Sequence, residues 1–131
     1  MRLKFSILLI IVSIAQSCIP TGRDYGKELY EEKCANCHGI EGNGLQQLYP
    51  PIKNSDYLIK NQEMLACMIR YGQEGAITVN GVGFNESMPA QPLLSDIDIY
   101  NIINYISKNI DSKIEPVHIQ TINDQLLDCK N

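Results

Sequence analysis

Apolar residues recur at helical spacing in three stretches of this chain of 131 residues, at positions 24–34, 61–71 and 95–109. Polar residues fill the positions between them, so each stretch has one apolar and one polar face. This period is typical of amphipathic α-helices. Each stretch also begins at a residue type that commonly caps helices, namely Asp24, Asn61 and Ser95. The pattern therefore predicts three main helices.

The two later helices have the clearest apolar faces. In 61–71 the face consists of Met64, Leu65, Met68 and Ile69, and we expect both methionines to pack in the core. In 95–109, Ser95 forms a capping-box pair with an aspartate three residues later. The apolar face of this last helix is built from Ile99, Ile102, Ile103, Ile106 and Ile110.

Shorter elements lie between these helices. A short helix is predicted over residues 55–59, with Ser55 as its cap. Residues 77–84 alternate weakly and contain Asn80-Gly81, which is a hairpin turn signal. We therefore expect an all-α fold of three main helices and one short helix, with a small two-stranded hairpin.

The N-terminus has the pattern of an export signal. Basic Arg2 and Lys4 precede an apolar run over 7–15, which is too short to span a bilayer comfortably. We interpret residues 1–17 as a signal peptide. Cys18 stands where cleavage would fall, and its surroundings resemble a bacterial lipobox. Residues 18–23 are therefore expected to form a lipidated tether that anchors the protein to a membrane on the periplasmic side of the cell envelope. A plain signal peptide with an incidental cysteine is the alternative.

The rest of the chain is short enough for one domain. We place that domain at residues 24–110, and residues 111–131 form a C-terminal tail that is too polar for a core of its own. The tail is expected to pack on the domain. His118, within it, lacks a partner at ligand spacing, so we expect it to be solvated rather than to bind a metal ion.

The net charge of the chain restricts the classes of molecule that it is expected to bind. The net charge of −4 becomes −6 once the signal peptide, with its two basic residues, is removed. An acidic exported chain with no tryptophan and no basic patch is a poor nucleic-acid binder. It suits a partner with a positive docking face, although a generally acidic soluble surface is the simpler interpretation.

Cys34, Cys37 and His38 form the motif Cys-x-x-Cys-His. This order is typical of covalent haem c attachment, in which each thiol adds to a haem vinyl group and the histidine binds the iron through Nε2. A redox dithiol would be expected within a βαβ pattern, and a zinc site would need a second ligand pair. The sequence contains neither, so we expect one covalent haem c.

Met88 is the candidate for the second axial ligand. The prolines that follow it keep its segment extended, and a thioether ligand raises the reduction potential of a haem. Pro50 is the candidate for a carbonyl that accepts the proton on His38 Nδ1. The alternatives are that Met88 belongs to an ordinary surface loop, or that Met64 or Met68 is the ligand.

Taken together, the motifs between residues 25 and 110 resemble those of the class I cytochromes c. They are Gly26-x3-Tyr30-x3-Cys34, Cys34-x-x-Cys37-His38-Gly39, Pro50-x-Ile52, Ser87-Met88-Pro89 and the isoleucine-rich last helix. The resemblance implies the fold of that class around one haem c. It also implies attachment sites at Cys34 and Cys37, axial ligands His38 and Met88, and a Pro50 carbonyl that faces His38.

The same resemblance implies that Gly26 and Tyr30 cross the last helix near Ile102 and Tyr105. It further implies an electron carrier rather than an enzyme, working between a redox donor and acceptor such as a membrane-bound oxidase or dehydrogenase. Two alternatives stay open. One is a fixed subunit of a larger respiratory or dehydrogenase complex, and the other is a haem enzyme or sensor with an open iron site. A single Cys-x-x-Cys-His favours the carrier.

Cys67 and Cys129 are left over after haem attachment and lipidation. Exported proteins tend to pair such thiols, so we expect a disulfide that pins the tail across the domain. It would give Ile119, Ile122, Leu126 and Leu127 a surface to bury against. The alternative is that Cys67 is an inert core thiol and Cys129 a loose end, because pairing does not follow from sequence.

Overall fold

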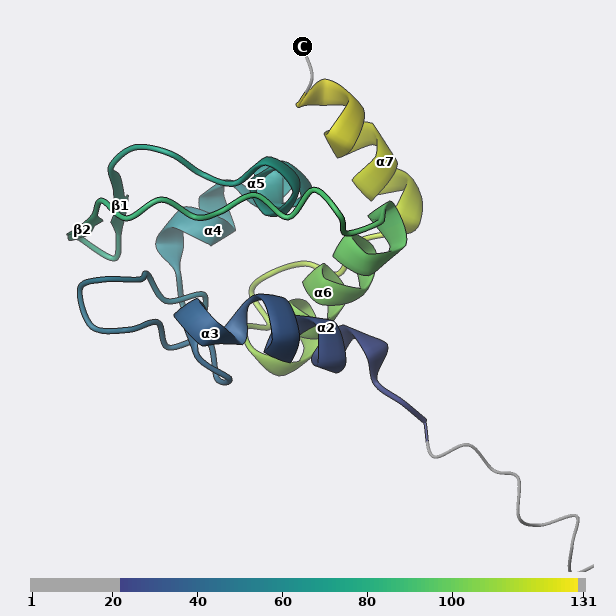
Figure 1. Cartoon of the computed structure of the whole chain (residues 1–131), viewed down its shortest axis with the longest axis horizontal. Helices are drawn as coiled ribbons and strands as arrows, with labels where there is room; N and C mark the ends of the chain where they lie inside the picture. Colours follow the sequence, from purple (N-terminus) through teal and green to yellow (C-terminus); the bar gives the residue numbers. More distant parts are fainter. Residues whose placement is uncertain (1–21, 130–131) are drawn as a thin grey trace, which may run out of the picture.

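The computed structural model describes residues 22–129, so the predicted signal peptide, Cys18 and most of the tether lie outside the described residues. The helices are α2 (Tyr25–Lys33), α3 (Ala35–His38), α4 (Asp56–Lys60), the 3-10 helix η1 (Gln62–Met64), α5 (Leu65–Tyr71), α6 (Asp96–Asn109) and α7 (Ile119–Asp128) (Figure 1). The strands are β1 (Ile77–Val79) and β2 (Val82–Phe84). This confirms the predicted helical fold with a small hairpin. Within residues 22–129 no helix is both long and apolar enough to cross a bilayer.

Helices α2 and α6 cross closely at a glycine. A Cβ atom on Gly26 would lie 2.5 Å from the carbonyl oxygen of Asn101 and 2.9 Å from Cβ of Tyr105. One turn further along α2, the rings of Tyr30 and Tyr105 have their centroids 5.4 Å apart. Gly26 therefore sets the distance between the two helices, and the pair of tyrosine rings fills the space beside it.

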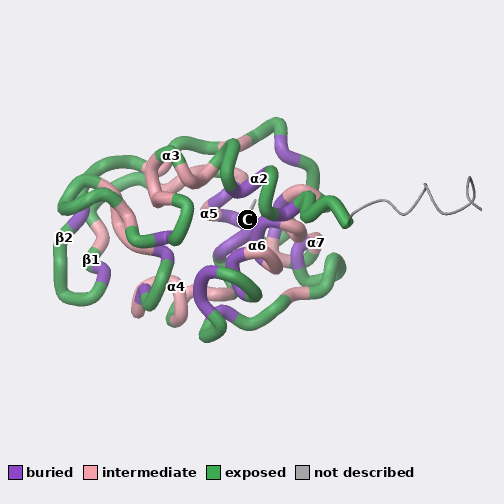
Figure 2. The backbone as a smooth tube through the Cα atoms, turned by 90° about the horizontal axis from the view of Figure 1, so that it is seen from below, coloured by how far each residue is buried: buried purple, intermediate pink, exposed green. Residues whose placement is uncertain are grey.

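Helix α6 forms the centre of the core. Its N-terminus has the predicted capping box, in which Ser95 Oγ accepts from the Asp98 N–H and the Asp98 carboxylate accepts from the Ser95 N–H. The expected apolar face is buried throughout, with Ile99 and Ile102 fully inaccessible to solvent. Figure 2 shows buried backbone concentrated where α5 and α6 meet.

The predicted helix over 61–71 is wrong in its first turn, which is the separate 3-10 helix η1. Asn61 does not cap it, because its side-chain amide donates back to the Tyr57 carbonyl oxygen at 2.7 Å. Met64 is 44% exposed, so its assignment to the core is also wrong. The apolar residues keep their helical spacing across the boundary between η1 and α5. Periodicity alone therefore does not reveal where one helix ends and the next begins.

The C-terminal tail contains a helix, α7, that the sequence did not predict. It packs on α5 and α6, and its residues Ile122 and Leu126 are buried. Ile119 and Leu127 are 38% and 63% exposed, so the expectation that they are buried is wrong. Ile119 shares the face of Ile122 and Leu126 but is the first residue of α7, and Leu127 lies off that face.

A disulfide joins α5 to the end of α7 in the structure. The Cα atoms of Cys67 and Cys129 are 5.8 Å apart, although 62 positions separate the two residues in the chain. This distance is within the range that disulfide geometry allows. The tail is therefore brought against α5 at the end of its last helix.

The hairpin projects on the side of the molecule away from α7 (Figure 1). Strands β1 and β2 pair antiparallel, with Val79 opposite Val82. The turn residues Asn80 and Gly81 have φ angles of 51° and 79°, as the Asn-Gly signal predicts. Asn80 also exchanges hydrogen bonds with Asp56, whose carboxylate accepts from the Asn80 N–H at 2.7 Å. This exchange ties the hairpin to the start of α4.

Candidate cofactor site

The two cysteines of the motif lie one helical turn apart. The Cys34 carbonyl oxygen accepts hydrogen bonds from the N–H groups of Cys37 and His38, at 3.2 and 3.0 Å. The spacing of the motif therefore places both thiols and the imidazole on one short helical segment. Neither cysteine is part of a disulfide, and both are half-buried.

The electrostatics of Cys34 do not suit a redox dithiol. Burial, together with the charge of the neighbouring Cys37, raises the pKa of the Cys34 thiol to about 11. Reactive dithiol cysteines instead have lowered pKa values, because the thiolate is the nucleophile. Within the described residues, no group of three His, Cys, Asp or Glu side chains is placed to hold a metal ion.

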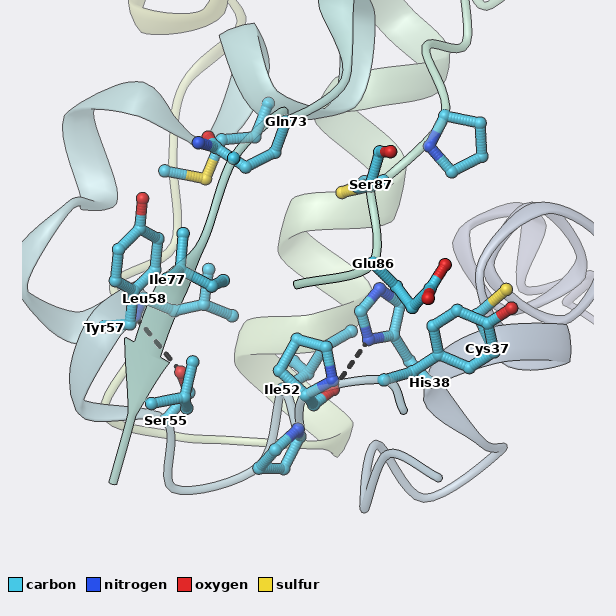
Figure 3. A pocket seen from close by; sticks show the side chains of 18 residues that line it. Cys37, His38, Ile52, Ser55, Tyr57, Leu58, Gln73, Ile77, Glu86 and Ser87 are labelled. Atoms are coloured by element: carbon cyan, nitrogen blue, oxygen red, sulfur yellow. Dashed lines mark hydrogen bonds between the residues drawn. The ribbon is translucent and has the colours of Figure 1, made fainter. Parts of the chain in front are cut away.

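The ring of His38 is oriented by a backbone carbonyl. Its Nδ1 atom lies 2.9 Å from the Pro50 carbonyl oxygen (Figure 3, dashed line). Because a carbonyl oxygen only accepts, Nδ1 carries the proton in this contact and the lone pair of Nε2 is left for a ligand. Burial lowers the pKa of His38, and the hydrogen bond to Pro50 opposes that effect. The unused lone pair of Nε2 and the lowered pKa both favour an imidazole that can bind a metal ion.

Gly44 permits the approach of the Pro50 segment. Its N–H donates to the His38 carbonyl oxygen at 2.8 Å, and a Cβ atom on it would lie 2.5 Å from the Tyr49 carbonyl oxygen. On the other side of the motif, the buried hydroxyl of Tyr30 donates to the Gly39 carbonyl oxygen at 2.7 Å. Burial raises the pKa of this hydroxyl, which keeps it a donor. The loop around His38 is thus fixed from two sides.

Two adjoining hollows share His38 and Met88, which line both of them. Cys37 lines the first and Cys34 the second, so the motif faces both. Figure 3 shows His38 on one side of the first hollow, with Gln73 across from it. The inner hollow is otherwise walled by apolar side chains, among them Leu65, Ile69, Ile102, Ile106 and Ile114.

These hollows fit a haem. Their walls are mainly apolar with a few polar groups, as is typical of cofactor pockets. The chemistry of the donors also fits, because the two adjoining hollows are lined by one cysteine each and share the His38 imidazole and the Met88 thioether. Met68 lines both hollows as well, whereas Met64 lines neither.

The loop that carries Met88 (residues 87–91, the Met88 loop) is held by backbone contacts with the end of α5. The N–H of Met88 donates to the Gln73 carbonyl oxygen at 2.9 Å, and the N–H of Gln73 donates to the Met88 carbonyl oxygen at 3.0 Å. A Cβ atom on Gly72 would lie 2.5 Å from the same Met88 oxygen. This supporting role of Gly72 and Gln73 was not predicted from the sequence, although a glycine at a helix end signals a close approach.

His118 lies apart from this site. It precedes the first residue of α7 and is exposed, as expected for a solvated side chain.

Comparison with known proteins identifies the family. A family model described as Cytochrome c matches residues 24–109, well over half of the chain. The chain belongs to the cytochrome c family. Its single Cys-x-x-Cys-His motif and mainly helical fold make it a class I, monohaem cytochrome c, and its cofactor is covalently bound haem c.

The relatives found are cytochromes of Thermus thermophilus. One cytochrome c-552 of this species is 31% identical over 86 residues, which are 63% of this chain and 65% of the relative. A second cytochrome c-552, from a particular strain of the same species, is also 31% identical over 86 residues, which are 57% of its length. The chain thus spans less than two thirds of the length of these curated relatives.

Proposed function

We propose that this protein is an electron carrier, with haem c attached through Cys34 and Cys37 and with His38 and Met88 as axial ligands. One observation carries the proposal: the His38 imidazole and the Met88 thioether line two adjoining hollows, of which Cys37 lines the first and Cys34 the second. The haem, when bound, supplies reversible one-electron chemistry at its iron.

In this proposal each residue has a defined task. Pro50 keeps the proton on His38 Nδ1, so Nε2 is presented to the iron in one orientation. The Met88 loop would supply a thioether sulfur as the second protein ligand, so that both ligands of the iron would come from the protein and no site would be left for a substrate. The isoleucines of α6 exclude water from the inner hollow, and an apolar surrounding favours the ferrous state.

The ligand assignment is tested by Met88→Ala in protein matured with haem. The ferric wild-type protein should show the weak near-infrared absorption of a sulfur-to-iron bond, and the variant should lose it and have a lower reduction potential. Met64→Ala is the matched control, because Met64 is exposed and lines neither hollow. An unchanged band in Met88→Ala would refute the assignment. Rapid carbon monoxide binding by the ferrous wild type would instead indicate an open iron site.

We further propose that the carrier is exported, is anchored by lipid on Cys18, and serves a membrane-bound oxidase or dehydrogenase. The basic start, the apolar run and the cysteine that ends it support this. Two or more acyl chains would anchor the protein stably. Mass spectrometry of the mature protein should find an acylated Cys18 at its N-terminus, and Cys18→Ala should release the protein from membranes. An unmodified N-terminus elsewhere would contradict the anchor.

A further inference from the structure

The C-terminal segment (residues 110–129) lies beyond the region that the family model matches, yet it reaches the cofactor pocket. Ile114, only 1% exposed, lines the inner hollow together with Cys34 and Met88. The turn before Ile114 is fixed by the buried Asp111, whose carboxylate accepts from the N–H groups of Asn54 at 2.6 Å and Lys113 at 3.0 Å. Part of the pocket wall therefore comes from outside the matched domain.

Two amide side chains of the domain fasten the segment that follows. Asn104 on α6 exchanges two hydrogen bonds with the backbone of Val117, at 3.0 and 3.1 Å. Gln62 in η1 accepts from the Glu115 N–H at 2.7 Å. The segment between Ile114 and α7 is therefore held by hydrogen bonds from α6 and from η1.

Helix α5 takes its N-terminal cap from α7. The residue before α5, Met64, provides no side-chain cap, and Gln125 Oε1 accepts instead from the Ala66 N–H at 3.2 Å. The Gln125 amide also donates to the Gln62 carbonyl oxygen at 3.4 Å. The neighbouring Cys67 is joined to Cys129, one turn after Gln125. Two adjacent residues of α5 are thus fixed by α7.

Helix α5 in turn carries the Met88 loop. The carbonyl oxygen of Ile69 accepts from the Gln91 N–H at 3.1 Å, and Gln73 pairs with Met88 just beyond the helix. Met68 on the same helix lines both hollows. A shift of α5 would therefore move Met88 relative to His38.

We propose that the C-terminal segment is a positioning element of the haem site. Ile114 closes the apolar wall, and Gln125, beside the Cys67–Cys129 bridge, holds α5 so that the Met88 sulfur keeps its place. This inference rests on the proposed function, since it concerns the geometry of the Met88 ligand. Gln125 is a positioning residue, because it lines neither hollow.

The first test uses Gln125→Leu in haem-loaded protein, well below its unfolding temperature. We expect a weaker near-infrared band and a lower reduction potential. Gln125→Glu should largely keep both, because a carboxylate oxygen still accepts from the Ala66 N–H. Gln120→Leu is the matched control, because Gln120 bonds to Asp124 on the exposed side of the same helix. A purely stabilising role would lower the unfolding temperature without changing the band or the potential.

The second test addresses the wall. Ile114→Ala should lower the reduction potential because it lets water approach the pocket, and Ile114→Val should do so less. Ile119→Ala, in the same segment but outside both hollows, should leave the potential unchanged. If the wild type has the band while Gln125→Leu and the Ile114 variants keep its intensity and potential, the inference is overturned and the carrier stands. If the wild type lacks the band, the Met88 ligation fails and the inference with it.

Discussion

At the residue scale, the site depends on three glycines, which have no side chain, as much as on the side chains that line the pocket. Gly26, Gly44 and Gly72 each lie where a Cβ atom would come within 2.5 Å of a backbone oxygen. Gly26 lets α2 reach α6, Gly44 lets the Pro50 segment reach His38, and Gly72 lets the Met88 loop reach α5. A heavier residue at any of them would push a ligand or its support out of place.

Gly26→Ala tests this most simply, because Gly26 lies inside a helix and needs no unusual φ angle. We expect a loss of about 1–3 kcal/mol of unfolding free energy from overpacking against Asn101, partly offset by the better helix propensity of alanine. Gly83→Ala is the control, since a Cβ there meets nothing within 4 Å. Denaturant unfolding followed by circular dichroism measures both. Equal stability of the two variants would contradict the close crossing.

At the element scale, the helices differ in where their caps come from. Helix α6 carries its own capping box in Ser95 and Asp98, and Asp98 also accepts from the Tyr25 hydroxyl at 2.9 Å. Helix α5 has no cap of its own and borrows one from Gln125. The start of α6 is therefore encoded locally, and the start of α5 depends on the tail.

Because of the capping box at the start of α6, the free energy of unfolding should depend on pH in the acid range. Hydrogen bonds from Ser95, above all from its hydroxyl, lower the pKa of Asp98 below its usual 3.8. A lowered folded-state pKa means that the carboxylate stabilises the fold above pH 3.8 and that this contribution is lost as the pH falls through the folded-state value. Asp98→Asn should therefore be less stable than wild type at neutral pH, and the difference should shrink in acid. Urea unfolding across this range measures it, and a difference that is the same at every pH would contradict the prediction.

At the scale of the whole molecule, the C-terminal segment joins parts of the domain that are distant in the chain. It contacts η1, α5 and α6, and the Cys67–Cys129 bridge lies at its far end. Its own burial is modest, with Ile114, Ile122 and Leu126 among its buried apolar residues. A covalent link therefore compensates for a small interface.

The bridge gives a quantitative prediction. Closing a loop across 62 positions is expected to stabilise the fold by roughly 4 kcal/mol through the unfolded state. The double variant Cys67→Ala, Cys129→Ala should lose about that amount of unfolding free energy, as measured by denaturant unfolding of haem-loaded protein. Intact wild type should resist alkylation at both positions unless it is reduced. Quantitative alkylation of both thiols in the unreduced native protein would show that the bridge is absent in solution.

The sequence by itself determined what depends on neighbours along the chain. The motif of Cys34, Cys37 and His38 works within about one helical turn, so its spacing alone brings the three side chains together. The helix α6 with its capping box and the Asn80-Gly81 turn are local in the same sense, and all appear as predicted. Residue types alone predict hydrogen bonds between residues three or four positions apart. They also predict turns whose positive φ angles favour asparagine and glycine.

Only the tertiary structure decided what depends on packing between distant segments. Two methionines on one apolar stretch look equivalent in the sequence, yet Met68 lines the pocket and Met64 is exposed, because Met64 ends η1 whereas Met68 lies within α5. Helix α7 was not predicted, although Ile119, Ile122 and Leu126 recur at helical spacing, and its packing against α5 and α6 is visible only in the structure. The wall residue Ile114 and the borrowed cap Gln125 follow from the same contacts, which no local pattern records.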